Sequence, residues 1–375
     1  MLKASDFYNE LFDNEIDSFY GVPDSLLKDF CAYISEGVRS AKNIITANEG
    51  SAIAMAAGYN LATGKIPLVY MQNSGLGNTI NPLISLVDEE VYSIPMLLLI
   101  GWRGEPGIKD EPQHVKQGKV TLGLLETLGI EYEILPDNLD EAKVSVSKAR
   151  LFIKNNSKPF AFVVKKNTFE KYGKKNEALT ELSLSREDAL QMILRKISHE
   201  DILVSTTGKL SRELYEFRED NNMSHASDFL TVGSMGHASS IALGIAREKE
   251  NRNVFCLDGD GAMLMHMGAL SGNGTSDAKN FKHVLFNNGV HESVGSQKTA
   301  GFLVDFPLIA KSCGYKNVFS VKSKEELENK LSSFLESEGP SFLEIKINSD
   351  SRTDLGRPKT TPLENKNEFI RFIRK

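Results

Sequence analysis

The sequence has little cysteine and tryptophan, with three and one of these residues among 375. Its cysteines, Cys31, Cys256 and Cys313, are far apart and lack the spacing of metal ligands, so we expect buried, reduced thiols. The seven histidines are scattered, and no pair has zinc-site spacing. These scarcities argue against a disulfide-stapled secreted domain and against a structural zinc domain.

Long apolar runs and basic blocks are also missing. The longest apolar run, residues 94–100, is too short to cross a bilayer, and the first residues, MLKASDFYNELFD, lack the apolar core of a signal peptide. The formal net charge is −6, and no lysine- or arginine-rich block stands out. We therefore expect a cytoplasmic protein that binds neither nucleic acid nor membrane.

What is present is an alternation of short apolar runs with helical patterns, in a chain of 41% hydrophobic and 25% charged residues. It predicts an α/β protein with two doubly wound parallel-sheet domains, divided into residues 1–166, a polar linker at 167–184, and residues 185–375. The predicted strands are residues 68–71, 96–100, 160–164, 202–205, 254–257, 284–286 and 342–347. The predicted helices include residues 50–62, 122–128, 186–197, 239–247 and 324–335.

Polar residues follow two predicted strands of the second half. Gly259-Asp260-Gly261 comes directly after residues 254–257, and Asn287-Asn288 comes after residues 284–286. In a parallel sheet both strands end at one edge, beside helix N-termini that favour phosphate. Carboxylate and amide oxygens, with glycines that allow close backbone approach, suit Mg²⁺ carrying a diphosphate. The alternative is a pair of ordinary turns after strands.

A glutamate in the first half stands at the start of an alanine-rich helix. Glu49 follows the apolar pair Ile44-Ile45, and the small residues after it permit close packing. A carboxylate at this position also stabilises a helix dipole, which is the alternative role.

Together, GDG–NN and the segment NEGSAIAMAAGYNLATG resemble the two cofactor motifs of thiamine-diphosphate-dependent enzymes. The resemblance implies a pyrimidine-binding domain in the first half and a diphosphate-binding domain in the second. It also implies that Glu49 hydrogen-bonds the aminopyrimidine of thiamine diphosphate and promotes formation of the reactive ylid. The chain leaves no room for the third domain of larger relatives, so it is similar to the short two-domain decarboxylases acting on 3-phosphonopyruvate or 3-sulfopyruvate.

The same resemblance implies the remaining contacts to the cofactor and metal. Asp260, Asn288 and the backbone carbonyl of Val290 would bind Mg²⁺, whereas the Asn287 side chain would be structural. Met235 would prop the cofactor into a bent conformation, with a core methionine as the alternative. The other expected cofactor-binding residues are Asn73, Thr207, Gly208, Ser234, Gly259, Gly261 and Ala262.

Substrate-side residues are expected in the loops. Asp24 is a candidate catalytic residue, and its alternative role is to cap the following helix. His114 is another, in a glycine- and proline-rich segment at residues 101–118 that we expect to be a loop over the site. His291 is a candidate acid–base residue, or a loop histidine hydrated by water. Three basic residues, Arg103, Lys109 and Lys116, are candidates for binding a dianion, or are simply solvated surface residues.

The resemblance thus implies Mg²⁺- and thiamine-diphosphate-dependent decarboxylation of an anionic 2-oxo acid. The C-terminal segment SRTDLGRP favours 3-phosphonopyruvate as substrate, with phosphonoacetaldehyde and CO2 as products, as part of phosphonate biosynthesis. The alternatives are 3-sulfopyruvate decarboxylation and a non-catalytic subunit that binds thiamine diphosphate. The resemblance also implies a homodimer or homotetramer whose sites lie between subunits, with Glu49 from one chain and Asp260 and Asn288 from another.

Overall fold

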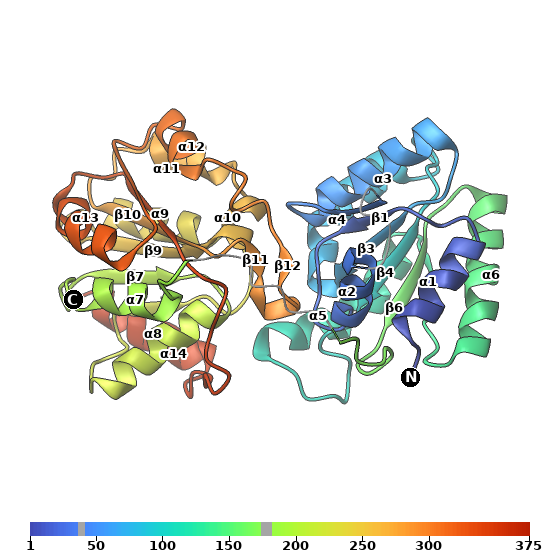
Figure 1. Cartoon of the computed structure of the whole chain (residues 1–375), viewed down its shortest axis with the longest axis horizontal. Coiled ribbons are helices and arrows are strands. Elements are labelled where there is room, and N and C mark those ends of the chain that lie inside the picture. The colour runs from blue at the N-terminus through green and yellow to red at the C-terminus, as the bar shows by residue number, and fades with distance from the viewer. Residues whose placement is uncertain (37–41, 174–181) are drawn as a thin grey trace. The chain divides into compact units, whose positions relative to one another are not determined.

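The computed structural model describes residues 1–36, 42–173 and 182–375 (Figure 1). The chain divides into two compact units. The first comprises Met1–Asn176 with His291–Gln297, and the second comprises Glu177–Val290 with Lys298–Lys375. Residues 174–181 of the expected linker lie outside the described residues. Among the described residues, no helix is both long enough and apolar enough to span a membrane.

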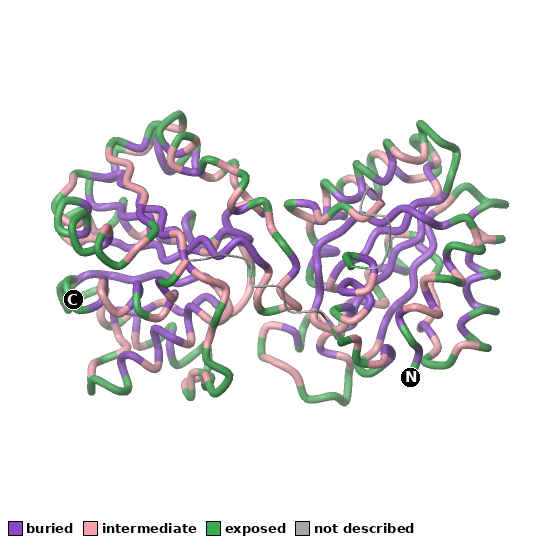
Figure 2. Tube along the Cα trace, viewed as in Figure 1, coloured by how far each residue is buried: buried purple, intermediate pink, exposed green. Residues whose placement is uncertain are grey.

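The first unit is built on a six-stranded parallel sheet with the order β2-β1-β3-β4-β6-β5. The central strands β4 and β6 are buried along their whole length, as their continuous apolar sequences predict (Figure 2). The strands are β1 (Phe19–Gly21), β2 (Asn43–Ile45), β3 (Leu68–Gln72), β4 (Leu97–Gly101), β5 (Glu131–Ile134) and β6 (Phe160–Val164).

Helices cover both faces of this sheet (Figure 1). One face packs against α1 (Ala4–Asp13), α2 (Lys28–Glu36) and α6 (Leu139–Asn156). The other packs against α3 (Glu49–Thr63), the π-helical turn η3 (Leu83–Val87) and α5 (Pro112–Thr127). The short 3-10 turn η2 (Asn73–Gly75) and α4 (Leu76–Pro82) connect β3 to η3.

The second unit repeats this architecture with the strand order β13-β14-β10-β9-β7-β8, again all parallel. Its strands are β7 (Ile202–Ser205), β8 (Asp228–Leu230), β9 (Val254–Gly259), β10 (Phe281–Asn287), β13 (Asn317–Val321) and β14 (Ser341–Lys346). A separate two-stranded sheet pairs β11 (Val290–His291) with β12 (Gln297–Lys298), and the 3-10 turn η4 (Glu292–Val294) lies between them.

Two layers of helices enclose the second sheet. One contains α7 (Arg186–Leu194), α8 (Lys209–Asp220) and α13 (Lys324–Glu336). The other contains α9 (Ala238–Glu248), α10 (Asp260–Met265), α11 (Ala269–Gly274), α12 (Phe306–Ser312) and α14 (Pro362–Ile373).

The predicted fold class is therefore confirmed, because both halves form doubly wound parallel sheets. One local expectation is wrong. Residues 101–118 are not a continuous loop, because α5 begins at Pro112 and places His114 in a helix. Proline at the first helical position needs no N–H partner there and already has a helical φ angle, so it starts the helix that its ring would interrupt elsewhere.

Candidate active site

In the second unit, the carboxyl ends of β9 and β10 bring Asp260 and Asn287 together. The two strands are neighbours, with Phe286 paired to Gly259, and Asp260 begins α10 immediately after β9. Both side chains converge on Gly301. An ideal Cβ at this glycine would lie 2.5 Å from Asn287 Oδ1 and 2.6 Å from Asp260 Oδ2. Gly301 therefore permits a close approach that any larger residue would block.

The Asp260 carboxylate is almost inaccessible, with 2% of the residue exposed. Its Oδ2 accepts a hydrogen bond from the Thr299 hydroxyl. Burial raises the pKa of Asp260 to about 6, although hydrogen bonds from Thr299 and from backbone N–H groups oppose this shift. A divalent cation would offset the cost of burying this carboxylate, so the oxygen-rich site fits Mg²⁺.

The neighbouring asparagines differ in their contacts. Asn287 donates from Nδ2 to the carbonyl of Gly301 at 2.7 Å and to Glu344 Oε1 at 2.9 Å, so its amide holds the surrounding loops together. Asn288 Oδ1 accepts from the backbone N–H of Val290 at 3.1 Å. This turn brings the Asn288 side chain next to Val290. These two residues are the metal ligands expected in addition to Asp260.

Two further loops reach the same edge of the sheet. Thr207 Oγ1, at the end of β7, donates to the carbonyl of Val232 at 2.9 Å. Gly208, with φ of 103°, follows directly and is the N-cap residue of α8. The predicted cofactor-binding residues Thr207 and Gly208 are therefore hydrogen-bonded, through Thr207, to the segment that leads to Ser234 and Met235.

The Ser234–Gly236 turn is conformationally unusual. Ser234 has φ of 56° and Gly236 has φ of 87°, so half-buried Met235 stands between two left-handed residues. An ideal Cβ at Gly236 would lie 2.8 Å from the carbonyl of Ala262. The Met235 turn thus packs on the residues that follow Asp260, including Gly261 and Ala262, whose N–H groups are expected to face the diphosphate.

In the first unit, Glu49 is the first residue of α3, and only 5% of it is exposed. Asn48 caps the helix by accepting from the Ser51 N–H at 2.8 Å. Glu49 Oε2 accepts from Asn78 Nδ2 at 2.7 Å, and an ideal Cβ at Gly75 would lie 2.5 Å from Glu49 Oε1. The carboxylate is therefore fixed in one orientation, as a proton-transferring group requires.

Asp24 follows β1 and is completely buried. Its Oδ2 accepts from the Leu26 N–H at 2.8 Å, so it caps the turn that precedes α2. Its Oδ1 accepts from Gln72 Nε2, at the end of β3. Asp24 thus caps the turn before α2 rather than the helix itself, and its catalytic role stays a prediction.

Asn73 contacts the protein backbone through both ends of its amide. Nδ2 donates to the carbonyl of Arg103 at 2.8 Å and to Thr121 Oγ1 at 2.9 Å, while Oδ1 accepts from the Arg103 N–H at 3.1 Å. These contacts favour a bracing role for Asn73 over the predicted cofactor contact.

The two candidate catalytic histidines have different settings. His114 is 9% exposed, and its Nδ1 has no hydrogen-bond partner among the described residues. Burial, with the positive charge of Arg103, lowers the pKa of His114. His291 is half-buried in β11, and burial lowers its pKa to about 4. Both rings are therefore neutral near pH 7.

Other polar clusters in the described residues lack such features. Cys256, Asp258 and His283 have ligand atoms close together in the second unit, but all three residues are fully buried. His283 contacts Asp258 at 3.3 Å and the Tyr315 hydroxyl at 3.0 Å, so hydrogen bonds account for the cluster.

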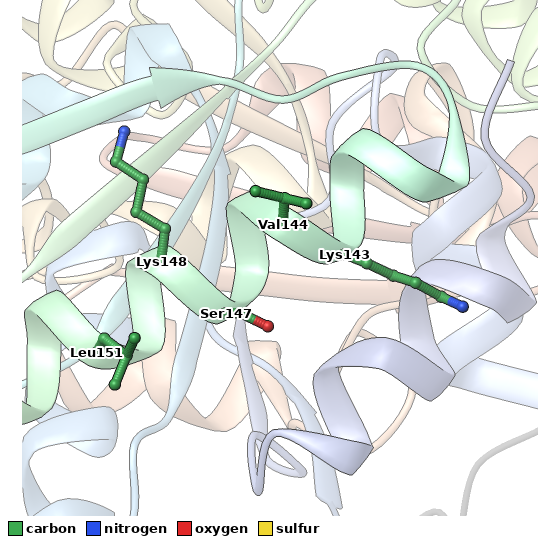
Figure 3. A pocket seen from close by; sticks show the side chains of 5 residues that line it. All are labelled: Lys143, Val144, Ser147, Lys148 and Leu151. Atoms are coloured by element: carbon green, nitrogen blue, oxygen red, sulfur yellow. The ribbon is translucent and has the colours of Figure 1, made fainter.

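A shallow hollow on α6 is also separate from the predicted site (Figure 3). Side chains on the exposed face of that helix line the hollow, and none of these residues is a predicted site residue. They are Lys143, Val144, Ser147, Lys148 and Leu151.

Several residues that contact the predicted site residues were not predicted from the sequence. Thr299 and Gly301 contact Asp260, Gln72 contacts Asp24, and Gly75 packs against Glu49. The signal available in the sequence was weak, since it consisted of small or polar residues near the recognised motifs.

Comparison with known proteins identifies both units. Residues 4–122 match the family described as thiamine pyrophosphate enzyme, N-terminal TPP binding domain. Residues 206–345 match the corresponding C-terminal TPP binding domain.

Three relatives are similar along most of the chain. A phosphonopyruvate decarboxylase of Streptomyces viridochromogenes is 33% identical over 399 residues, covering 100% of this chain and 95% of the relative. One from Streptomyces hygroscopicus is 34% identical and covers 99% and 94%. A sulfopyruvate decarboxylase of Methanosarcina acetivorans is 30% identical and covers 83% and 82%.

Two thiamine-pyrophosphate domains without a middle domain, together with similarity over the full length, settle the family. The chain belongs to the phosphonopyruvate decarboxylase family of thiamine-pyrophosphate-dependent decarboxylases.

Proposed function

We propose that this protein converts 3-phosphonopyruvate to phosphonoacetaldehyde and CO2, with thiamine diphosphate and Mg²⁺ as cofactors. The observation that carries the proposal is full-length similarity to two phosphonopyruvate decarboxylases, in a chain that retains Glu49 and Asp260 in buried settings. Family membership supports thiamine diphosphate directly, and the oxygen donors around Asp260 support Mg²⁺.

The residues have separate roles in this proposal. Asp260, the Asn288 side chain and the Val290 carbonyl hold Mg²⁺, and the N–H groups of Gly261 and Ala262 receive the diphosphate. Bound thiamine diphosphate supplies the electron sink for the electron pair left by CO2. Glu49 moves the proton that activates the cofactor, since Asn78 and Gly75 fix the position of its carboxylate.

His114 is the favoured substrate-side histidine. Its ring is buried and neutral, and its Nδ1 has no partner in the described part of the chain. It can therefore accept or donate a hydrogen bond to the bound 2-oxo acid. Asp24 and His291 are secondary candidates for proton transfer, and Met235 for holding the cofactor bent.

The wider setting belongs to the same proposal. The protein acts in the cytoplasm as a homodimer or homotetramer, and its sites lie between subunits. Free cysteines at Cys31, Cys256 and Cys313 agree with a reducing compartment. The reaction serves phosphonate biosynthesis.

Decarboxylation of 3-sulfopyruvate is the second candidate, and it is supported by the 30% identity to a sulfopyruvate decarboxylase. A non-catalytic subunit has less support, since Glu49 and Asp260 are both present.

A side-by-side assay of CO2 release tests the function. We expect purified protein to release CO2 from 3-phosphonopyruvate faster than from 3-sulfopyruvate, and only with thiamine diphosphate and Mg²⁺ present. Faster release from 3-sulfopyruvate would favour the second candidate, and release from neither acid would contradict both.

A further inference from the structure

Three basic residues near the first active-site loops, Arg103, Lys109 and Lys116, are candidates for binding a dianion. Both lysines are exposed, whereas Arg103 is half-buried at the end of β4. Burial strengthens the attraction of a cation for an anion, because water screens the charges less. The setting therefore distinguishes Arg103 from the two lysines.

Arg103 is held rigidly along its whole length. The Asn73 amide accepts a hydrogen bond from the Arg103 backbone N–H and donates one to the Arg103 carbonyl. Asp110 accepts from Nε at 2.8 Å and from Nη2, and the Ser25 hydroxyl accepts from Nη1 at 2.8 Å. A guanidinium fixed in this way loses little conformational freedom when an anion binds.

The Arg103 guanidinium still has donors available. Of its five N–H groups, these contacts use three: Nε–H, one on Nη2 and one on Nη1. One N–H on each terminal nitrogen remains, and no described residue accepts from either. These two N–H groups can donate hydrogen bonds to the oxygens of a phosphonate.

Three carboxylates act on the charge of Arg103, those of Asp110, Asp24 and Glu111, and the first two already accept hydrogen bonds. Asp110 also accepts from the backbone N–H groups of Gly104 and Glu111, each at 2.8 Å. Asp24 accepts from Gln72 and from the Leu26 N–H. Their charges are therefore partly satisfied within the unit, and Asp110 serves to position Arg103.

A second observation indicates a ligand at this place. His114 is 9% exposed, and its buried Nδ1 is unpartnered in the described residues. Arg103 is close enough to lower the pKa of His114. The backbones are locked together as well, since an ideal Cβ at Gly104 would lie 1.9 Å from the His114 carbonyl.

Arg352, near the C-terminal end of the chain, is a weaker candidate than Arg103 for binding an anion. Arg352 pairs with Glu187 at 2.9 Å and with Glu216, and it also contacts Asp354 at 3.3 Å. Three carboxylates around one guanidinium favour a structural role, in which the segment after β14 is fastened to α7 and α8.

We propose that Arg103, positioned by Asp110 and Asn73, binds the dianionic phosphonate of the substrate, with Ser25 and His114 as its neighbours in this anion site. This inference rests on the proposed function. It makes Arg103 the residue that selects substrates with a doubly charged end.

The test compares Arg103→Met with Lys109→Met, a matched loss of one positive charge from the same segment. We expect Arg103→Met to lower kcat/KM for 3-phosphonopyruvate by roughly a hundredfold, and Lys109→Met to change it less than about threefold. The affinity for thiamine diphosphate should be unchanged in both variants. The double variant Arg103→Met/Asp110→Asn should show the same loss, which excludes the unpaired Asp110 carboxylate as its cause.

Binding of 3-phosphonopropionate, an unreactive dianion, to the holoenzyme separates this inference from the proposed function. If the wild type binds it and Arg103→Met does not, the anion site stands even if no CO2 is released. Equal binding by both proteins, or equal kcat/KM values, would overturn the assignment of Arg103. So would an equal loss in Lys109→Met.

Discussion

Glu49 illustrates how the site depends on single residues. Its carboxylate is buried at the N-terminus of α3, between the amide of Asn78 and the backbone of Gly75. A helix N-terminus stabilises a negative charge, so the fold can keep this carboxylate buried. The cofactor-activating role proposed for Glu49 requires that combination of burial and fixed orientation.

Replacing Glu49 by Gln preserves the shape and the hydrogen-bond acceptor for Asn78 but removes the proton-transferring group. We expect kcat to fall by roughly 10²- to 10⁴-fold, as for other general acid–base residues. The affinity for thiamine diphosphate, measured by calorimetry, should change far less. A variant with nearly normal kcat would rule out the role proposed for Glu49.

Gly301 is a second residue on which the site depends, because Asp260 and Asn287 both occupy the space that a Cβ at this position would need. In Gly301→Ala, the added methyl group would displace one of these side chains, at a cost of about 1–3 kcal/mol. We expect weaker Mg²⁺-dependent binding of thiamine diphosphate, measured by calorimetry. Gly272→Ala is the control, since Gly272 in α11 has open space around its Cα. Equal affinities in the two variants would show that close packing at Gly301 is unimportant.

At the residue scale, the site residues that lie in recognisable motifs after strands could be predicted from the sequence. A carboxylate and an asparagine amide were expected to meet where two apolar strands end, and Asp260 and Asn287 do meet there, whereas the role of Asn288 as the metal ligand stays a prediction. Thr299, Gly301 and Asp110 could not be predicted in the same way. Thr299 and Gly301 act through contacts with residues distant in the sequence, and Asp110 acts within a single loop whose fold has no sequence signature.

At the scale of elements, β10 carries an unusual buried lysine. Lys282 is only 1% exposed, and its Nζ donates to the carbonyls of Phe334 and Ser337. These carbonyls lie at the C-terminal end of α13, where a positive charge is favourable. Lys282 thus links the central strand β10 to the helix that covers it.

Burial lowers the pKa of Lys282 to about 8, from an ordinary value of 10.5. Between these two values the unfolded chain binds more protons than the folded chain, so this group makes the free energy of unfolding rise with pH. We expect the stability difference between the wild type and Lys282→Met to shift in favour of the wild type as the pH increases from 8 to about 10.5. Urea denaturation followed by circular dichroism measures it.

Lys279→Met is the matched control for this prediction. Lys279 is an exposed lysine whose contact is an ion pair with Glu338, so its stability difference from the wild type should remain flat over this pH range. A flat difference for Lys282→Met as well would contradict the proposed effect of burial.

The interior strands other than β1 were predicted from the sequence, and the edge strands were not. The strands at residues 68–71 and 160–164 were found because both faces of a central parallel strand are apolar. The short strand β2 was missed, since its residues are only partly buried. The start of α5 was missed because prolines and glycines in residues 101–118 indicated a loop.

At the scale of the whole molecule, the proposed sharing of the site between subunits makes a distinct prediction. Glu49→Ala and Asp260→Ala should each abolish decarboxylation. A mixture of the two should regain activity if subunits exchange, because a mixed dimer contains one site with both residues intact. Light scattering and native mass spectrometry would establish assembly and exchange. Absence of activity despite proven exchange would contradict the shared site.

The most direct test of the account is ³¹P NMR of the purified protein with 3-phosphonopyruvate, thiamine diphosphate and Mg²⁺. We predict that the substrate resonance is replaced by that of phosphonoacetaldehyde with the wild type, and that it persists with Glu49→Gln. A persistent substrate resonance with wild-type protein that has bound both cofactors would contradict the account.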